Sequence, residues 1–157
     1  MRNPQALARA LALLVPTVAL AAAFGSQYLG GLTPCEMCWW QRYAHMAALV
    51  FALIALVAGG RPLVWLAALA IAVSGGIGFY HAGVELHYFP GLTQCTATAT
   101  GGSTEEFLKA IMNAPLVRCD DIQWSFLGIS MAGWNAILSL GSALLILWLS
   151  IRRSRPI

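Results

Sequence analysis

The chain has 157 residues, of which 59% are hydrophobic and only 10% are charged, and its mean hydropathy is +0.73. A soluble domain carries roughly 25% charged residues. This composition therefore excludes an ordinary soluble enzyme, a disordered chain and a nucleic-acid-binding protein, and it indicates a protein that lies in a lipid bilayer. The net charge of +3 matters less than where each sign falls along the chain.

Four long segments without a formal charge predict four membrane-spanning helices. The uncharged segments have 26, 18, 23 and 30 residues. About 20 mostly apolar residues in a helix cross a hydrocarbon core of roughly 30 Å. The sequence therefore predicts an all-α membrane protein, a single domain over 1–157 in which four transmembrane helices form a bundle. The expected spans are 9–30, 41–59, 62–82 and 127–149.

The first expected span follows Arg2 and Arg9 and contains Pro16, which predicts a kink that neighbouring helices tolerate in a membrane. The small residues at 21–23 would also fit the cleavage site of a signal peptide. The apolar run continues to Leu29, which suits a retained span better.

Basic residues predict the orientation of the spans. With four spans both chain ends lie on one side, and the loops richer in Lys and Arg face the cytoplasm. Six basic residues fall on the side of the membrane that holds the two chain ends, and three fall on the opposite side. We therefore expect cytoplasmic N- and C-termini and outward-facing loops at about 31–40 and 83–126. The six are Arg2, Arg9, Arg61, Arg152, Arg153 and Arg155, and the three are Arg42, Lys109 and Arg118.

The second outer loop is the one long polar segment. Its uncharged part, 86–104, is rich in Thr and Gly and could not satisfy its backbone in lipid, so we expect it in water. Ser103 to Glu106 has the pattern of a capping box, and the apolar residues after it fall on one side of a short helix that Pro115 ends. This amphipathic helix would lie on the membrane surface or pack on the end of the bundle.

Cys35 and Cys38 form a C-x-x-C motif directly after Pro34, where the second span begins. A helix N-terminus presents unpaired N–H groups and a partial positive charge, which favour the thiolate of a nearby cysteine. Cys38, in the first turn, gains most from this field. So short a ring is typical of redox-active pairs rather than of structural disulfides.

Arg42 lies four residues after Cys38, so the two side chains share a face of the expected helix. A guanidinium there would stabilise a thiolate or an anionic acceptor. Because a charge at the membrane boundary is costly unless it is paired or used, Arg42 is a candidate binding residue. The alternative is that its side chain extends to the lipid headgroups.

Cys95 and Cys119 lie in the second outer loop, with 23 residues between them. An outward-facing loop is in an oxidising compartment, so a disulfide between them is expected. Four cysteines allow three connectivities, and a purely structural bridge is the alternative for this pair. A zinc site usually has two short C-x-x-C pairs. The wide second pair therefore predicts no metal site, even with His87 as a substitute ligand.

Two histidines are candidate binding residues at the same end of the bundle. His81 lies near the outer end of the third span, and His45 comes three residues after Arg42. A histidine beside a cysteine pair at the membrane edge can donate a hydrogen bond to a quinone carbonyl. The alternative is an interior histidine that is hydrogen-bonded for structural reasons.

Several features together resemble the disulfide bond formation protein B (DsbB) family: the run PCEMCWWQR at 34–42, the four spans and the cysteine pair of the second outer loop. The runs YHAGVE at 80–85, RCD at 118–120 and MAGWN at 131–135 add to the likeness. The resemblance covers almost the whole chain. A C-x-x-C motif alone would be a weak signal, whereas this combination is a specific one.

Membership would imply a multi-pass enzyme of the bacterial inner membrane, a thiol:quinone oxidoreductase whose electron transport supports disulfide bond formation. It would reoxidise a periplasmic, thioredoxin-fold partner of the DsbA type and pass two electrons to ubiquinone or menaquinone, in the system that keeps the periplasm oxidising. By that resemblance Cys95 would form the mixed disulfide with the partner and Cys119 would be its loop mate. Cys35 would relay electrons between the pairs, and Cys38 would face the quinone.

The resemblance also makes Arg42 the family's quinone-side arginine, and His81 a histidine near the quinone in some members. The chain is short for the family, and the Thr/Gly-rich stretch after Cys95 does not align with it, which leaves the thiol partner open. The chemistry has independent support. Electrons that pass from a water-side dithiol to a lipid-soluble carrier need one pair in an aqueous loop and another at the membrane boundary, and this sequence has both.

Two other interpretations fit parts of the sequence. A vitamin K epoxide reductase-like enzyme is also a four-helix thiol and quinone protein, but its active pair usually lies near the end of the chain, whereas C-x-x-C opens the second span here. A non-enzymatic membrane scaffold with two structural disulfides is the other. It predicts no bound quinone and cysteines that are indifferent to reductant.

Overall fold

Four long helices make up most of the structure, a computed structural model that describes residues 3–91, 103–105, 108 and 118–152. The helices are α1 (Pro4–Tyr28), α2 (Glu36–Ala58), α3 (Arg61–Glu85) and α5 (Met131–Ile151). Each is long and apolar enough to cross a membrane. The predicted bundle of four transmembrane helices is confirmed.

Local sequence determines where the helices begin. The Asn3 side chain accepts the N–H of Gln5, and Cys35 and Ser130 each accept the N–H three residues later, so all three residues are N-caps. The cap at Cys35 starts α2 at Glu36, which puts Cys38 in its first turn. α1 runs unbroken through Pro16, whose side chain is buried.

A small hairpin precedes α5, which therefore begins at Met131 rather than at 127. Strand β1 (Ser125–Phe126) pairs antiparallel with β2 (Ile129–Ser130), with Ser125 opposite Ser130 and Phe126 opposite Ile129. Leu127 and Gly128, between the strands, both have positive φ, as the two central residues of a type I′ turn do. The sequence pattern did not predict this hairpin.

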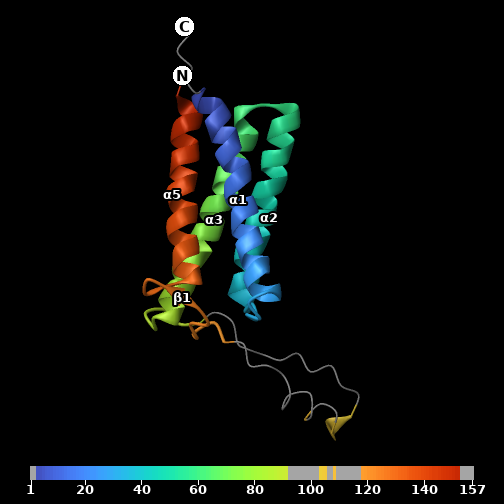
Figure 1. Ribbon diagram of the computed structural model, residues 1–157, viewed down its shortest axis with the longest axis vertical. Helices are drawn as coiled ribbons and strands as arrows, with labels where there is room; N and C mark the ends of the chain where they lie inside the picture. The colour runs from blue at the N-terminus through green and yellow to red at the C-terminus, as the bar shows by residue number, and fades with distance from the viewer. Residues whose placement is uncertain (1–2, 92–102, 106–107, 109–117, 153–157) are drawn as a thin grey trace.

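The helices run alternately up and down, so that the start of α1, the end of α5 and the α2–α3 turn lie at one end of the bundle (Figure 1). The turn uses Gly59 and Gly60, whose φ angles of 72° and 96° suit glycine. The hairpin, the start of α2 and the end of α3 lie at the opposite end (Figure 1). The C-x-x-C motif is therefore at the end away from the termini.

The helices pack through small residues and turn large apolar side chains outward. Alanines of all four helices form most of the buried cluster, while leucines and valines such as Leu69, Leu138 and Val57 are exposed. Small residues let helices approach closely in lipid, where apolar burial does not drive association. This distribution fits a bundle whose outer surface contacts acyl chains.

Within the second long loop, Thr104, Glu105 and Leu108 are helical, at the position of the expected short helix. The rest of that predicted helix lies outside the described residues. Cys95 lies outside them too, so the expected Cys95–Cys119 disulfide stays a prediction.

Candidate functional site

Cys35 and Cys38 form a dithiol at the start of α2. Cys35 is the N-cap, and its sulfur accepts the backbone N–H of Cys38 at 3.3 Å. The Cys35 thiol also donates to the Cys38 sulfur, with the two sulfur atoms 3.0 Å apart. The cap geometry thus brings together two sulfurs that the sequence separates by two residues.

The proton of this pair belongs to Cys35. The pKa of the Cys35 thiol is raised far above its ordinary value, first because the thiol donates to the Cys38 sulfur and second because it is buried. Cys38 is the acceptor of that hydrogen bond and lies in the first turn of α2, where the helix terminus favours negative charge. The arrangement therefore makes Cys38 the more nucleophilic sulfur.

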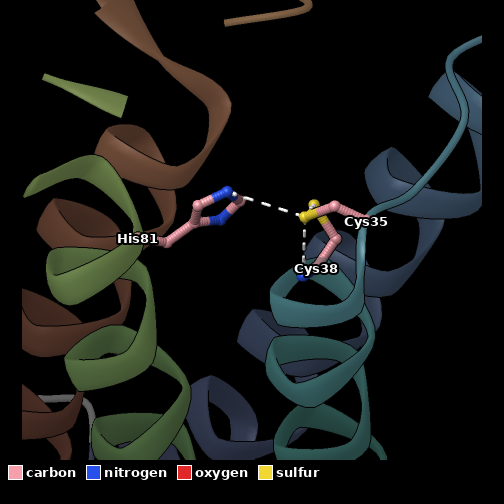
Figure 2. A group of neighbouring side chains, drawn as sticks. All are labelled: Cys35, Cys38 and His81. Carbon is pink, nitrogen blue, oxygen red and sulfur yellow. Dashed lines mark hydrogen bonds between the residues drawn. The ribbon is translucent and has the colours of Figure 1, made fainter. Parts of the chain in front are cut away.

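His81 reaches the dithiol from α3. Figure 2 shows its ring facing Cys35 across the space between α3 and the start of α2, and its Nε2 lies 3.6 Å from the Cys35 sulfur. The same nitrogen is 3.9 Å from Glu85, one turn further along α3. Ser130, the cap of α5, lies beside the Glu85 carboxylate. Three elements therefore meet at this site.

Cys119 brings a third sulfur to the same end of the bundle. Its side chain is buried in a cluster with Cys35, Met37 and Val84. The backbone of Cys119 also faces His81. A loop cysteine thus lies beside the C-x-x-C pair, as thiol exchange between two pairs requires.

Arg42 is held one turn below the dithiol by α1. Its guanidinium donates to the side-chain oxygen of Gln27 and, at 2.9 Å, to the carbonyl of Ala23. The rings of Phe24 and Trp39 each lie 4.9 Å from it, at cation–π distance. Arg42 is only 6% exposed, so it does not extend to the lipid headgroups. It interacts electrostatically with Cys38.

His45 lies deeper and does not join the sulfurs. Its Nε2 is 3.0 Å from the Asn135 side-chain oxygen and 3.4 Å from the Ser139 hydroxyl, both on α5. Its Nδ1 is buried with no hydrogen-bond partner among the described residues. The structure thus brings together Cys35, Cys38, His81 and Cys119, with Arg42 nearby, while His45 belongs to a polar network below them.

Sequence reasoning missed this network and the acid beside it. Gln41, Ser74 and Asn135 connect α2, α3 and α5 by hydrogen bonds between residues 33 to 94 positions apart. A signal was present, because polar side chains within a span are costly in lipid and so mark functional positions. Glu85 is part of the run YHAGVE at 80–85, but the sequence predicted no role for it.

The ligand atoms of Cys35, Cys38 and His81 all lie within 4.8 Å of one another, close enough to hold a metal ion. Thiolate and imidazole are suitable ligands for zinc. The prediction of no metal site rested on the wide second cysteine pair and the oxidising side of the loops, with His87 as the substitute ligand, whereas here His81 completes the donor set. Whether His81 is free to act as a ligand depends on which ring nitrogen carries its proton.

Comparison with known proteins agrees with this geometry. The family model described as "Disulfide bond formation protein DsbB" matches residues 5–149. Disulfide bond formation protein B of Marinobacter nauticus is 31% identical over 93% of this chain and 92% of the relative. The protein of the same name from Paracidovorax citrulli is 34% identical over 94% of this chain and 89% of the relative. No solved structure matches this chain.

The family match spans all four helices together with the residues of the dithiol site. Its description, disulfide bond formation, is chemistry that a C-x-x-C pair beside a further cysteine can perform. The resemblance drawn from the motifs is confirmed. This multi-pass membrane protein belongs to the DsbB family of disulfide bond formation proteins.

Proposed function

We propose that the chain is an inner-membrane thiol:quinone oxidoreductase that reoxidises a periplasmic, DsbA-type dithiol oxidase and passes the electrons to ubiquinone or menaquinone. The observation that carries the proposal is the position of the dithiol. Cys35 and Cys38 lie at the end of a membrane-spanning helix, between a loop cysteine and a buried arginine. A relay that moves electrons from water-soluble thiols to a lipid-soluble acceptor needs a redox pair at the boundary between water and membrane.

The thiol side of the reaction uses exchange between cysteine pairs. A thiolate of the reduced partner attacks the Cys95–Cys119 disulfide, and the partner's second thiolate completes its own disulfide, which leaves the loop pair reduced. The loop pair then reduces the Cys35–Cys38 disulfide in the same way. The burial of Cys119 beside Cys35 supports this step, because the attacking and attacked sulfurs belong to one cluster.

The acceptor side needs an oxidant that takes two electrons and two protons from the Cys35–Cys38 dithiol. A quinone supplies this by becoming a quinol. The surroundings of Cys38 suit a flat, apolar molecule with carbonyl oxygens, because Phe24 and Trp39 provide aromatic surface and Arg42 provides buried positive charge. Arg42 stabilises negative charge at Cys38 or at an acceptor oxygen.

The test is anaerobic reduction of added ubiquinone by the purified protein supplied with a reduced DsbA-type donor. We expect turnover in the wild type and none in Cys38→Ser, because the variant lacks the sulfur that meets the acceptor. The variant should still trap the donor as a mixed disulfide at the loop pair. Unchanged quinone reduction in Cys38→Ser, or no turnover of the wild type with several donors and with both ubiquinone and menaquinone, would overturn the proposal.

A further inference from the structure

The buried amides beneath the dithiol determine the orientation of one another. The Asn135 nitrogen lies 3.2 Å from the Ser74 backbone carbonyl, which only accepts hydrogen bonds, so the Asn135 nitrogen is the donor and its oxygen faces His45. The same nitrogen lies 2.8 Å from the Gln41 oxygen. Asn135 therefore donates to Gln41, and its own oxygen accepts from the Ser139 hydroxyl at 2.8 Å.

Gln41 is fixed in the same way at both ends of its amide. Its oxygen accepts from Asn135, and its nitrogen donates to the Met37 backbone carbonyl at 3.1 Å. The second hydrogen on that nitrogen points to His81 Nδ1, 3.0 Å away. An amide nitrogen has no lone pair to offer, so His81 Nδ1 must be the acceptor.

This chain of donors decides the tautomer of His81. A neutral imidazole carries one proton, and with Nδ1 accepting from Gln41 that proton is on Nε2. Nε2 is the nitrogen that faces the Cys35 sulfur at 3.6 Å and Glu85 at 3.9 Å. His81 therefore presents an N–H donor, rather than a lone pair, to the dithiol.

We propose that Gln41, held by Asn135 and by the Met37 carbonyl, is a positioning residue that keeps His81 as an Nε2–H donor toward Cys35. The inference deepens the proposed function, in which Cys35 is the sulfur that exchanges with the loop pair. When Cys35 leaves a disulfide, the electron pair of the broken S–S bond stays on its sulfur and the attacking sulfur forms the new bond. The Nε2–H of His81 then donates to the Cys35 thiolate.

The same tautomer disfavours metal binding by the three close ligand atoms of Cys35, Cys38 and His81. A histidine that binds a metal through Nε2 usually donates its Nδ1–H to a carboxylate, a carbonyl or a water. Here Nδ1 faces the hydrogens of the Gln41 amide, so a proton on Nδ1 would have no acceptor at that position. Gln41 thus keeps Cys35, Cys38 and His81 in the thiol-exchange form and works against zinc binding.

Replacing Gln41 by glutamate tests the inference, because the change keeps the size of the side chain and turns a donor into an acceptor. In Gln41→Glu the new carboxylate accepts a proton from His81 Nδ1, and Nε2 presents its lone pair to the two sulfurs. Nitrogen-15 NMR of labelled, reduced protein distinguishes protonated from bare ring nitrogens. We expect the wild type to show a protonated Nε2 at His81 and Gln41→Glu to show a protonated Nδ1.

A zinc titration of the same reduced samples gives a second readout. Because outer partners of ligating histidines change metal affinity by about 10- to 100-fold, we expect Gln41→Glu to bind Zn²⁺ about that much more tightly than the wild type. Gln27→Glu is the matched control. This change adds the same negative charge on α1, beside Arg42 and away from His81. It should leave both the spectrum of the His81 ring and the zinc affinity as in the wild type.

A wild-type spectrum with the His81 proton on Nδ1 would overturn the inference, as would a folded Gln41→Glu that keeps the wild-type tautomer and zinc affinity. If Gln41→Glu does not fold, the wild-type spectrum decides alone. Neither measurement requires a thiol donor or a quinone. They therefore give their answer even if the protein proves inactive in quinone reduction, so the two proposals fail separately.

Discussion

The two ends of the bundle differ in what fills their interior. The end that holds the start of α1 and the end of α5 can be followed in Figure 1. It is packed mainly with alanines, and we call it the alanine half. The other end, which holds the dithiol, buries Gln41, Arg42, His45, Ser74, His81, Glu85, Ser130 and Ser139, and we call it the sulfur end. Among the buried polar residues that the structure describes, Ser150 alone lies in the alanine half.

The difference shows how one small bundle separates stability from chemistry. Alanines give close helix contacts and carry no group that titrates or reacts. Polar side chains in a membrane span cost free energy, so their concentration at one end indicates function there. Substitutions at the sulfur end should change activity more than stability, and those in the alanine half the reverse.

The largest expected effect is that of Cys35→Ser at the sulfur end. Serine is a better N-cap than cysteine and can accept the Cys38 N–H, so α2 should keep its start. Without the sulfur no disulfide can form at this position. Donor-dependent quinone reduction should fall to the uncatalysed background while the thermal unfolding temperature stays close to that of the wild type.

Ala52→Ser is the matched change in the alanine half, where Ala52 is 2% exposed on the same helix. A helical serine can bond its own backbone carbonyl one turn back, so the cost should be small. We expect Ala52→Ser to keep full turnover. If it lost activity as Cys35→Ser does, the division between the two ends would be wrong.

The next effect in size is that of Arg42→Gln. Removing the buried charge beside Cys38 takes away stabilisation of negative charge at the acceptor side. We expect kcat/KM for the quinone to fall about 10- to 100-fold, equivalent to about 1.4 to 3 kcal/mol. The measurement is quinone-dependent turnover at saturating donor. Arg42→Lys keeps the charge but loses the planar fork, so it should recover part of the loss.

Arg61→Gln is the control for this change. Arg61 begins α3 at the far end of the bundle and is exposed, so the same loss of charge there should leave quinone use unchanged. An unaltered apparent quinone affinity in Arg42→Gln, or an equal loss in both variants, would contradict a role for Arg42 at the acceptor.

A smaller effect, on stability, is expected where α3 meets α5. A Cβ added to Gly75 would lie 2.9 Å from Leu140 Cγ and 3.1 Å from the Leu140 backbone nitrogen, closer than packed atoms approach. Gly75→Ala should therefore force the helices apart and cost about 1 to 3 kcal/mol. Thermal unfolding in detergent measures this as a lowered midpoint.

Gly76 offers a control one residue away on the same helix. A Cβ there meets nothing within 4 Å, so Gly76→Ala removes only the flexibility of glycine. It should be neutral or stabilise the protein by up to about 1 kcal/mol. Equal destabilisation by both changes would show that the α3–α5 contact is not the cause.

Much of this organisation could be predicted because it depends on local sequence. The absence of charge located four spans, and the spacing of Cys35, Cys38 and Arg42 placed them at one helix start. The residues at which helices begin were harder to predict, since the Cys35 cap and the hairpin before Met131 depend on single hydrogen bonds and turns. The family resemblance rested on the same local motifs.

The rest of the site depends on contacts between distant residues. Gln41 reaches His81, and Asn135 reaches Gln41 and His45, through pairs 40 to 94 positions apart. No periodicity in the sequence specifies which polar residue of one span meets which residue of another. His45 was therefore predicted to bind a ligand, a prediction that stays untested, while its partner Asn135 was not considered.

The smallest expected effect concerns the turn that carries Cys119. Arg118 donates to both carboxylate oxygens of Asp120, at 2.8 Å for the Nε bond, and this holds the pKa of Asp120 down at about 2. A lowered carboxyl pKa means that the pair's contribution is complete above the ordinary value of 3.8 and is lost as the pH falls through about 2. The pair lies at the surface, with the Arg118 side chain 62% exposed and that of Asp120 30% exposed, so the gain in stability should be small. An NMR titration of Asp120 should have its midpoint near 2 in the wild type. The midpoint should move toward 3.8 in Arg118→Gln but not in the control Arg152→Gln. A wild-type midpoint already near 3.8 would show that the ion pair does not order this turn.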